Sequence, residues 1–170
     1  MENSAVLKMW FDSVDTDRSG SINCQELQRA LGAGNLHFTE SVVYQMIKLY
    51  DQDFSGSMNF TEFCSLHQFL VLVQNSFRGP FGSGRDRLSL NEVYEALRVV
   101  GFSLDQPSFY SACQSFDKGR TGQFTLDHYM SMCIFLKSAQ NLFRAFDTQR
   151  DGRVTLDFNQ FVYCAANLRI

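Results

Sequence analysis

Apolar side chains recur every three or four residues along most of the chain, which is the period of an α-helix that buries one face. Leu7, Trp10, Phe11 and Val14 begin this pattern and predict a first helix over residues 5–14. The same period returns in every later segment between the polar stretches of the sequence. We therefore expect an all-α fold.

Two of the predicted helices are long. The first begins at Phe60 and continues without a helix-breaking residue to about Phe77, and the second extends from about Asp127 to Phe146. The expected inward-facing residues of the first are Phe63, Leu66, Phe69, Leu70 and Val73. Because nothing interrupts either segment, we expect each helix to end one helix–loop–helix unit and to begin the next.

A twelve-residue polar loop, DTDRSGSINCQE, follows the first helix from Asp15 to Glu26. Its oxygen-bearing residues fall at the alternating positions that bind calcium, which takes six to eight oxygen ligands at about 2.3–2.6 Å. Gly20 stands at the sixth position, where the backbone must turn, and Ile22 stands at the eighth, where a short strand pairs with a neighbouring loop. The predicted ligands are Asp15, Asp17, Ser19, Ser21, Asn23 and Glu26.

A second loop, DQDFSGSMNFTE, repeats the pattern 36 residues later, from Asp51 to Glu62. Gly56 and Met58 take the sixth and eighth positions, and the predicted ligands are Asp51, Asp53, Ser55, Ser57, Asn59 and Glu62. Three carboxylates in each loop predict calcium affinities of about 10⁻⁷–10⁻⁵ M, with Mg²⁺ as a competitor.

Three further loops keep the frame and lose ligands. If Glu92 closes the third loop, its position eight is Leu88, but its positions one, three, five and six are Phe81, Ser83, Arg85 and Asp86. The fourth loop, DKGRTGQFTLDH from Asp117, has Gly119 at position three and His128 at position twelve. We expect no calcium in the third loop and at most weak binding in the fourth, where Asp127 lies beside the closing position.

The fifth loop begins at Asp147 and has Asp151, Gly152 and Val154 at positions five, six and eight. Its exiting helix continues the apolar pattern only if two residues are inserted, and Gln160 then takes the closing position. A neutral amide cannot replace a bidentate carboxylate, so we expect no calcium site here.

The loops begin at residues 15, 51, 81, 117 and 147, with steps that alternate between 36 and 30. This internal repeat predicts a single domain over residues 5–170 with five units, approximately 5–32, 40–70, 70–100, 105–136 and 136–170. Units one and two should pair through their loops, as should units three and four. Unit five has no partner within the chain, so we expect its apolar exiting helix, with Phe161, Val162 and Leu168, to pair with a second chain. The alternative is that it folds back on its own chain or frays.

Charge and composition add constraints. Residues 1–75 carry a net charge of −5 and residues 76–170 a net charge of +2. Two calcium ions would change the first value to −1, which favours calcium-dependent association with acidic membranes or partners, although the charge can also simply reflect the ligands. Five cysteines without paired spacing indicate a reducing, cytoplasmic compartment, and no membrane span or signal segment is visible.

No catalytic signature is apparent. The sequence lacks a Ser/His/Asp or Cys/His arrangement and a phosphate-binding loop, and His37, His67 and His128 are scattered. We therefore expect neither an enzyme nor a nucleic-acid-binding protein.

The five units, the two shared helices and the insertion in the fifth loop together resemble the penta-EF-hand family over residues 5–170. The intact first loop at Asp15 is most similar to the programmed cell death protein 6 and peflin branch. The inactive third loop departs from many relatives, and we expect this chain to lack their Gly/Pro-rich N-terminal tail and the functions of that tail.

The resemblance implies a calcium-regulated adaptor. Such proteins form homodimers or heterodimers through the fifth EF-hand, and with calcium they engage hydrophobic or proline-containing segments of partners, often at membranes. Two alternatives are a calpain-like regulatory subunit of a larger enzyme and a calcium buffer.

Overall fold

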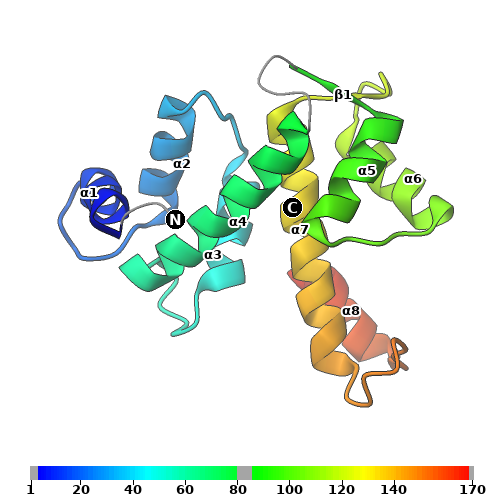
Figure 1. The fold of residues 1–170 in the computed structure, drawn as a ribbon. Helices are drawn as coiled ribbons and strands as arrows, with labels where there is room; N and C mark the ends of the chain where they lie inside the picture. The colour runs from blue at the N-terminus through cyan, green and yellow to red at the C-terminus, as the bar shows by residue number, and fades with distance from the viewer. Residues whose placement is uncertain (1–3, 80–85, 169–170) are drawn as a thin grey trace.

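The computed structural model describes residues 4–79 and 86–168, and this part of the chain forms eight helices and one two-stranded sheet (Figure 1). The fold is all-α, as predicted. The helices are α1 Ser4–Val14, α2 Cys24–Ala33, α3 Glu40–Tyr50, α4 Phe60–Arg78, α5 Leu90–Val100, α6 Gln106–Phe116, α7 Leu126–Phe146 and α8 Phe158–Asn167. The strands are β1 Leu88–Ser89 and β2 Gln123–Phe124.

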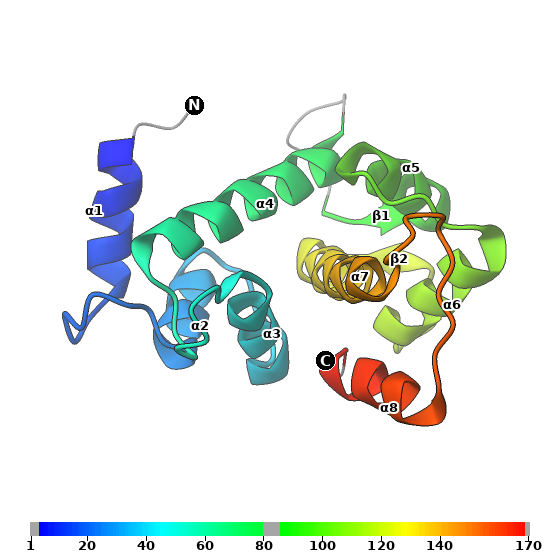
Figure 2. The same ribbon diagram turned by 90° about the horizontal axis from the view of Figure 1, so that it is seen from below.

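The two long helices are continuous, which confirms the prediction that they are shared between units. Helix α4 extends from the first three helices to α5, and α7 extends from the loop of unit four to unit five (Figures 1 and 2). A single break in either helix would separate the two units that it joins, so these helices fix how the loops are arranged.

Side-chain caps set where the shorter helices begin. Thr39 caps α3 by accepting a hydrogen bond from the backbone N–H of Val42, and Asp105 caps α6 through the N–H of Ser108. Pro107 lies in the first turn of α6, where its missing N–H costs no helical hydrogen bond.

The loops pair as predicted through their eighth positions. Ile22 and Met58 form an antiparallel bridge with reciprocal N–H···O bonds of 2.8 and 2.9 Å, which joins units one and two. Leu88 lies opposite Phe124 in the β1–β2 pair, which joins units three and four. This register confirms the placement of Leu88 at position eight of the third loop. Residues Phe81, Ser83 and Arg85 of that loop lie outside the described residues.

A continuous apolar core extends through the first four units. Phe11 of α1 is 1% exposed and packs edge-on against Phe60 and Phe63 of α4 at ring-centroid distances of 5.6 and 5.7 Å. Deeper in the molecule, the buried hydroxyls of Ser76 and Tyr129 lie 2.9 Å apart and join α4 to α7. Helix α8 contributes no buried residue to this core.

Trp10, which belongs to the apolar stripe of the first predicted helix, is 46% exposed, and its ring contacts His67 at a centroid distance of 5.5 Å. Phe143 on α7, and Phe161 and Ala165 on α8, are also exposed. Periodicity finds the apolar stripe of a helix, but it does not show whether another element covers that stripe. Within the described residues, no helix is both long enough and apolar enough to cross a bilayer.

Truncation of Phe11 should test the joint between units one and two. We expect Phe11→Ala to lower the free energy of unfolding by about 3–5 kcal/mol, since it leaves a cavity among buried rings. The matched control is Phe54→Ala, because Phe54 is 90% exposed and should change stability by about 0.5 kcal/mol or less. Urea unfolding at fixed calcium measures both, and equal effects would contradict the described core.

Candidate calcium sites

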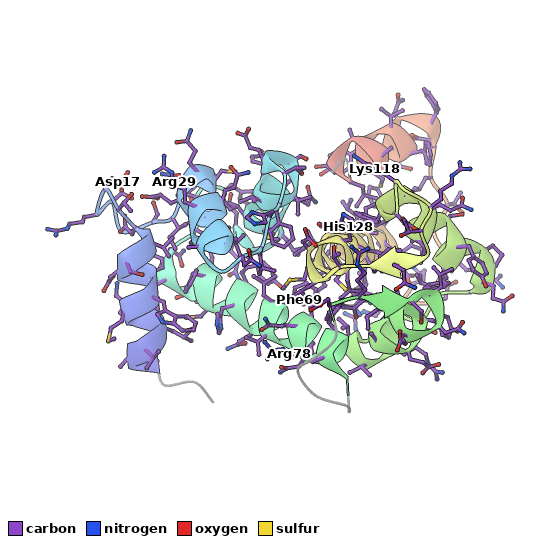
Figure 3. All side chains as sticks on the ribbon, turned by 90° about the horizontal axis from the view of Figure 1, so that it is seen from above. Asp17, Arg29, Phe69, Arg78, Lys118 and His128 are labelled. Carbon is purple, nitrogen blue, oxygen red and sulfur yellow. The ribbon has the colours of Figure 1, made fainter. Side chains whose placement is uncertain are left out.

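Each of the first two loops gathers three carboxylates around one point. Ligand oxygens of Asp15, Asp17 and Glu26 all lie within 4.8 Å of one another, and so do those of Asp51, Asp53 and Glu62. Asp17 is on the exposed side of its loop (Figure 3), whereas Glu26 and Glu62 are buried. Among the residues that the structure describes, these are the only groups of three such ligands.

The backbone of these loops follows one design, which two of the other loops share. The first aspartate accepts N–H bonds from positions five and six, in loop one from Ser19 at 2.9 Å and Gly20 at 2.8 Å. Position six is a glycine with positive φ, and position four also has a left-handed backbone although it is not glycine. The position-four residues are Arg18, Phe54, Arg120 and Arg150, with φ between 51° and 58°. Loops one, two, four and five therefore have similar first halves, and their side chains decide what they bind.

The closing glutamates join the loop to the exiting helix. Glu26 is the third residue of α2 and forms a capping box with Asn23: the backbone N–H of each residue donates to the side chain of the other, at 3.0 and 3.1 Å. Glu62 and Asn59 repeat this arrangement at the start of α4. The same carboxylates accept bonds from the beginning of their loops, Glu26 from Thr16 and Glu62 from the N–H of Gln52 at 2.8 Å.

Hydrogen bonding keeps the loop-one carboxylates ionised. Burial alone would raise the pKa of Asp15, but the N–H groups of Gly20 and Ser19 outweigh burial and lower it below its ordinary value. The pKa of Glu26 is lowered in the same way, against burial, by bonds from Asn23 and Thr16. In loop two, Ser55 lowers the pKa of Asp53. These groups carry negative charge at neutral pH and are suited to a hard divalent cation.

The serines and asparagines predicted as ligands lie in the same two loops as the carboxylate clusters. Ser19 and Ser55 donate their hydroxyls to the carbonyls of Ser21 and Ser57, at 2.9 and 3.1 Å. These hydroxyls and carbonyls are oxygen donors beside the carboxylates. That each of them is a ligand stays a prediction.

The fourth loop lacks this convergence. Asp117 accepts N–H bonds from Thr121 and Gly122, as in loops one and two, but Gly119 supplies no carboxylate. Asp127 is held by the hydroxyl of Thr125, and His128 takes the closing position. His128, in the first turn of α7, and Lys118, in the fourth loop, line the same pocket (Figure 3). No three-carboxylate cluster forms here among the described residues.

The fifth loop closes two residues late, as the sequence predicted. Asp157 is the N-cap of α8 and forms a capping box with Gln160, with N–H···O distances of 2.8 and 2.9 Å. Gln160 therefore has the place in its helix that Glu26 and Glu62 have in theirs. In unit three, Ser89 and Glu92 also form this box. The capping box thus persists in loops that have lost other calcium ligands.

Thr16 is one contributor that the sequence reasoning missed. Its N–H and its hydroxyl both donate to Glu26, each at 2.9 Å, and they hold the closing carboxylate over the loop. Position two is not a ligand position in the loop pattern, so only a backbone geometry could identify it. All five cysteines are free thiols; Cys113 and Cys133 are buried, whereas Cys24, Cys64 and Cys164 are half-buried. Burial raises the pKa of Cys113 to about 11.

Comparison with known proteins agrees with this geometry. A family model described as an EF-hand domain pair matches residues 4–68. The chain is 29% identical to zebrafish peflin over 158 residues, which is 92% of this chain and 58% of that protein. It therefore spans somewhat more than half of peflin. It is 30% identical to sorcin of Schistosoma japonicum over 160 residues, or 94% of this chain and 93% of that protein.

A solved structure has a similar fold. The homolog of programmed cell death 6 protein from Leishmania major Friedlin aligns with a TM-score of 0.70 and 34% identity, and the alignment covers 96% of this chain and 90% of that one. The relatives therefore correspond to the whole length of the sequence and not to the first two units alone.

Neutralising each closing glutamate should remove one site. We expect Glu26→Gln and Glu62→Gln each to halve the calcium stoichiometry measured by calorimetry, because an amide cannot supply two anionic oxygens. The double variant should bind no calcium with a dissociation constant in the predicted range of about 10⁻⁷–10⁻⁵ M. Glu40→Gln makes the same chemical change at an exposed position outside the loops and should leave both sites unchanged. Two ions bound by the double variant would overturn the loop assignment.

Proposed function

This chain belongs to the penta-EF-hand family of EF-hand calcium-binding proteins, and from that premise we propose that it is a calcium sensor and adaptor. It binds calcium in loops one and two, dimerises through unit five and engages partner proteins when calcium is bound. Residues 5–170 act as one domain. The observation that supports this proposal most directly is the convergence of three carboxyl side chains in each of two paired loops.

The residues fit the ion and provide a means of response. A bound Ca²⁺ would add two positive charges and would be coordinated by six to eight oxygens. Asp15, Asp17 and Glu26 would hold one ion, and Asp51, Asp53 and Glu62 the other. Because the closing glutamates are the third residues of α2 and α4, any shift of these carboxylates toward the loop moves the exiting helices. Ile22 and Met58 join the two loops through backbone hydrogen bonds. Mg²⁺ competes for the same oxygens.

Helix α8 supports the dimer proposal. Phe158, Phe161, Val162 and Tyr163 are 46–78% exposed on a helix that buries none of its residues, and Leu168 at its end is half-buried. Val154 of the fifth loop has no strand partner among the described residues. Unit five of a second chain offers the same apolar face and the same unpaired loop, which favours a two-fold arrangement. A related chain could replace the second copy.

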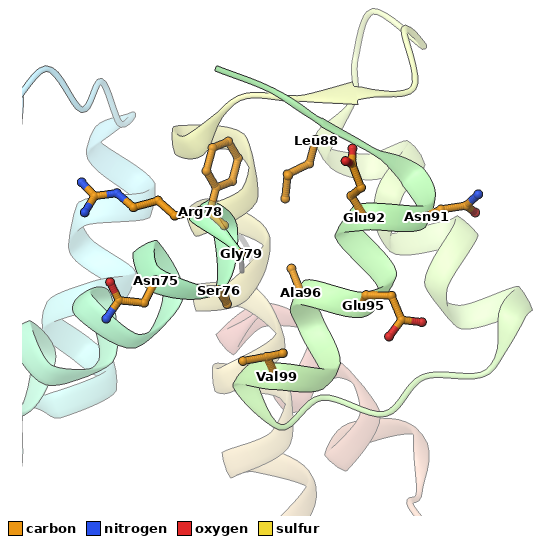
Figure 4. Close-up of a pocket in the computed structure, with 11 residues that line it drawn as sticks. Asn75, Ser76, Arg78, Gly79, Leu88, Asn91, Glu92, Glu95, Ala96 and Val99 are labelled. Atoms are coloured by element: carbon orange, nitrogen blue, oxygen red, sulfur yellow. The ribbon is translucent and has the colours of Figure 1, made fainter. Parts of the chain in front are cut away.

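A cavity beside unit three is suited to an apolar partner segment. It has a volume of about 520 Å³, lies between the end of α4 and α5, and includes Phe77, Leu88, Ala96 and Val99 in its lining (Figure 4). Since α4 begins at Glu62 of loop two and ends at this cavity, a movement of α4 would alter its shape. Hydrophobic or proline-containing segments are the proposed occupants.

Calcium also changes the charge of the first half of the chain from −5 to −1, which reduces repulsion from acidic surfaces. We propose a cytoplasmic protein that moves to membranes or membrane-bound partners with calcium. The site contains ligands for a cation, so the proposed role is regulatory and not enzymatic.

Charged substitutions on α8 should prevent dimerisation. We expect Phe161→Asp and Val162→Asp each to yield monomers by light scattering, because each places a carboxylate within an apolar interface. Tyr110→Asp, at an exposed aromatic residue of α6, is the control and should remain dimeric. An unchanged dimer mass in both α8 variants would exclude this surface.

The sensor role should be visible as exposed apolar surface. Calcium titration by calorimetry, with a hydrophobic dye measured in parallel, should give two sites near micromolar affinity and rising dye fluorescence. Two bound ions without a dye response would instead favour a buffer or a constitutive, calpain-like subunit. The Glu26→Gln/Glu62→Gln double variant is the control and should show neither change.

A further inference from the structure

Helix α8 is attached to the rest of the chain mainly through its last residue. Among the described residues, the hydrogen bonds from other elements to α8 all come from α3 and end on Asn167. Lys48 donates to the side-chain oxygen of Asn167 at 2.6 Å, and the amide of Gln45 donates to its backbone carbonyl at 3.3 Å. Figure 2 shows the end of α8 beside α3. Among the described residues, one aromatic ring contact joins α8 to another element, between Tyr163 and Phe146 of α7.

Gln45 also ties this contact to the core. Its side-chain nitrogen donates to Ser138 of α7 at 2.9 Å, and both Gln45 and Ser138 are buried. A buried amide that loses its acceptors is costly, so its position is tightly defined. One side chain therefore links three helices: α3, which leads into loop two, α7, which leads into unit five, and α8.

Helix α3 ends at a predicted calcium ligand. Asp51 is both the C-cap of α3 and the first carboxylate of loop two, and Lys48 lies in the last turn before it. No corresponding bond joins α8 to the helices that flank loop one within the described residues. The polar contact therefore joins α8 to the helix that precedes loop two and not to the helices that flank loop one.

We infer that calcium in loop two and dimerisation through α8 are coupled by the contact of Gln45 and Lys48 with Asn167. This inference rests on the proposed function, since it needs both a calcium site and a dimer. The conformation in which the loop-two carboxylates converge is also the one in which Asn167 is docked. Calcium stabilises the first feature, so it should also favour docking, fix the orientation of α8 and strengthen the dimer.

Dimer dissociation constants test the coupling. Sedimentation equilibrium in saturating Ca²⁺ and in EGTA should show the wild-type dimer at least about fivefold tighter with calcium, the lower range of known coupling between sites. Glu62→Gln should abolish this ratio, whereas Glu26→Gln should retain it, because only loop two adjoins α3. A ratio of one in the wild type, or a full ratio in Glu62→Gln, would overturn the inference.

The contact itself is tested by Lys48→Met, which keeps an unbranched side chain one atom shorter and removes its donor. It should still bind two ions and still dimerise, but with nearly the same dissociation constant in Ca²⁺ and EGTA. Lys118→Met changes the net charge equally at an exposed residue of the fourth loop that takes no part in the contact with Asn167, and should keep the wild-type ratio. If Lys48→Met also keeps it, the contact does not carry the coupling.

Hydrogen exchange provides a readout that needs no dimer. Calcium should slow exchange of the α8 amides in the monomeric Phe161→Asp variant and should have no such effect when Lys48→Met is added. The same calcium response in both variants would refute the coupling. Failure of the proposed function would look different: calorimetry would show no calcium binding, or sedimentation would show no dimer under any condition.

Discussion

The hydrogen bonds of the closing carboxylate fix how loops one and two are joined to the helices that follow them. Glu26 and Glu62 are at once predicted ligands, cap partners for their helices and acceptors for N–H groups ten residues earlier. A single side chain therefore joins the start of a loop, its end and the helix that follows. Where the sequence places His128 or Gln160 instead, the helix still begins at the same point but the carboxylate cluster is lost. The carboxylate cluster therefore requires a glutamate at the closing position, whereas the start of the helix does not.

Pairing explains why the odd unit differs from the others. Ile22 with Met58, and Leu88 with Phe124, satisfy backbone groups that would otherwise lie open at the loop edge. The apolar faces of the first four units close around one core. Within the described residues, unit five has neither a paired loop nor a buried helix face. Its helix is joined to α3 by polar contacts and presents an exposed apolar face.

The sequence was sufficient for features that repeat. The carboxylate clusters of loops one and two, position-eight pairing, the shared helices and the late closure at Gln160 all follow from a register that recurs along the chain. It was insufficient where the outcome depends on which elements meet in space. Trp10 belongs to an apolar stripe but is left partly uncovered, and Gln45 reads as an ordinary polar residue of a helix although it is buried between α3, α7 and α8. Contacts between residues 119 positions apart, as for Lys48 and Asn167, leave no local signal.

The strength of the α8 contact is consistent with a reversible role. A hydrogen bond that includes a charged group contributes about 1.5–3 kcal/mol, and solvent exposure places the bond from Lys48 to Asn167 at or below the lower end of this range. Calcium at one hundred times its dissociation constant stabilises the binding-competent state by about 2.7 kcal/mol. Under the proposed coupling, occupancy of loop two would therefore be sufficient to decide whether Asn167 is docked. Burial of a single apolar side chain contributes about 1.5–3 kcal/mol, and several such side chains would exceed what one ion supplies. A polar joint at the end of an otherwise unburied helix is therefore one that calcium can control, whereas the core around Phe11 is not.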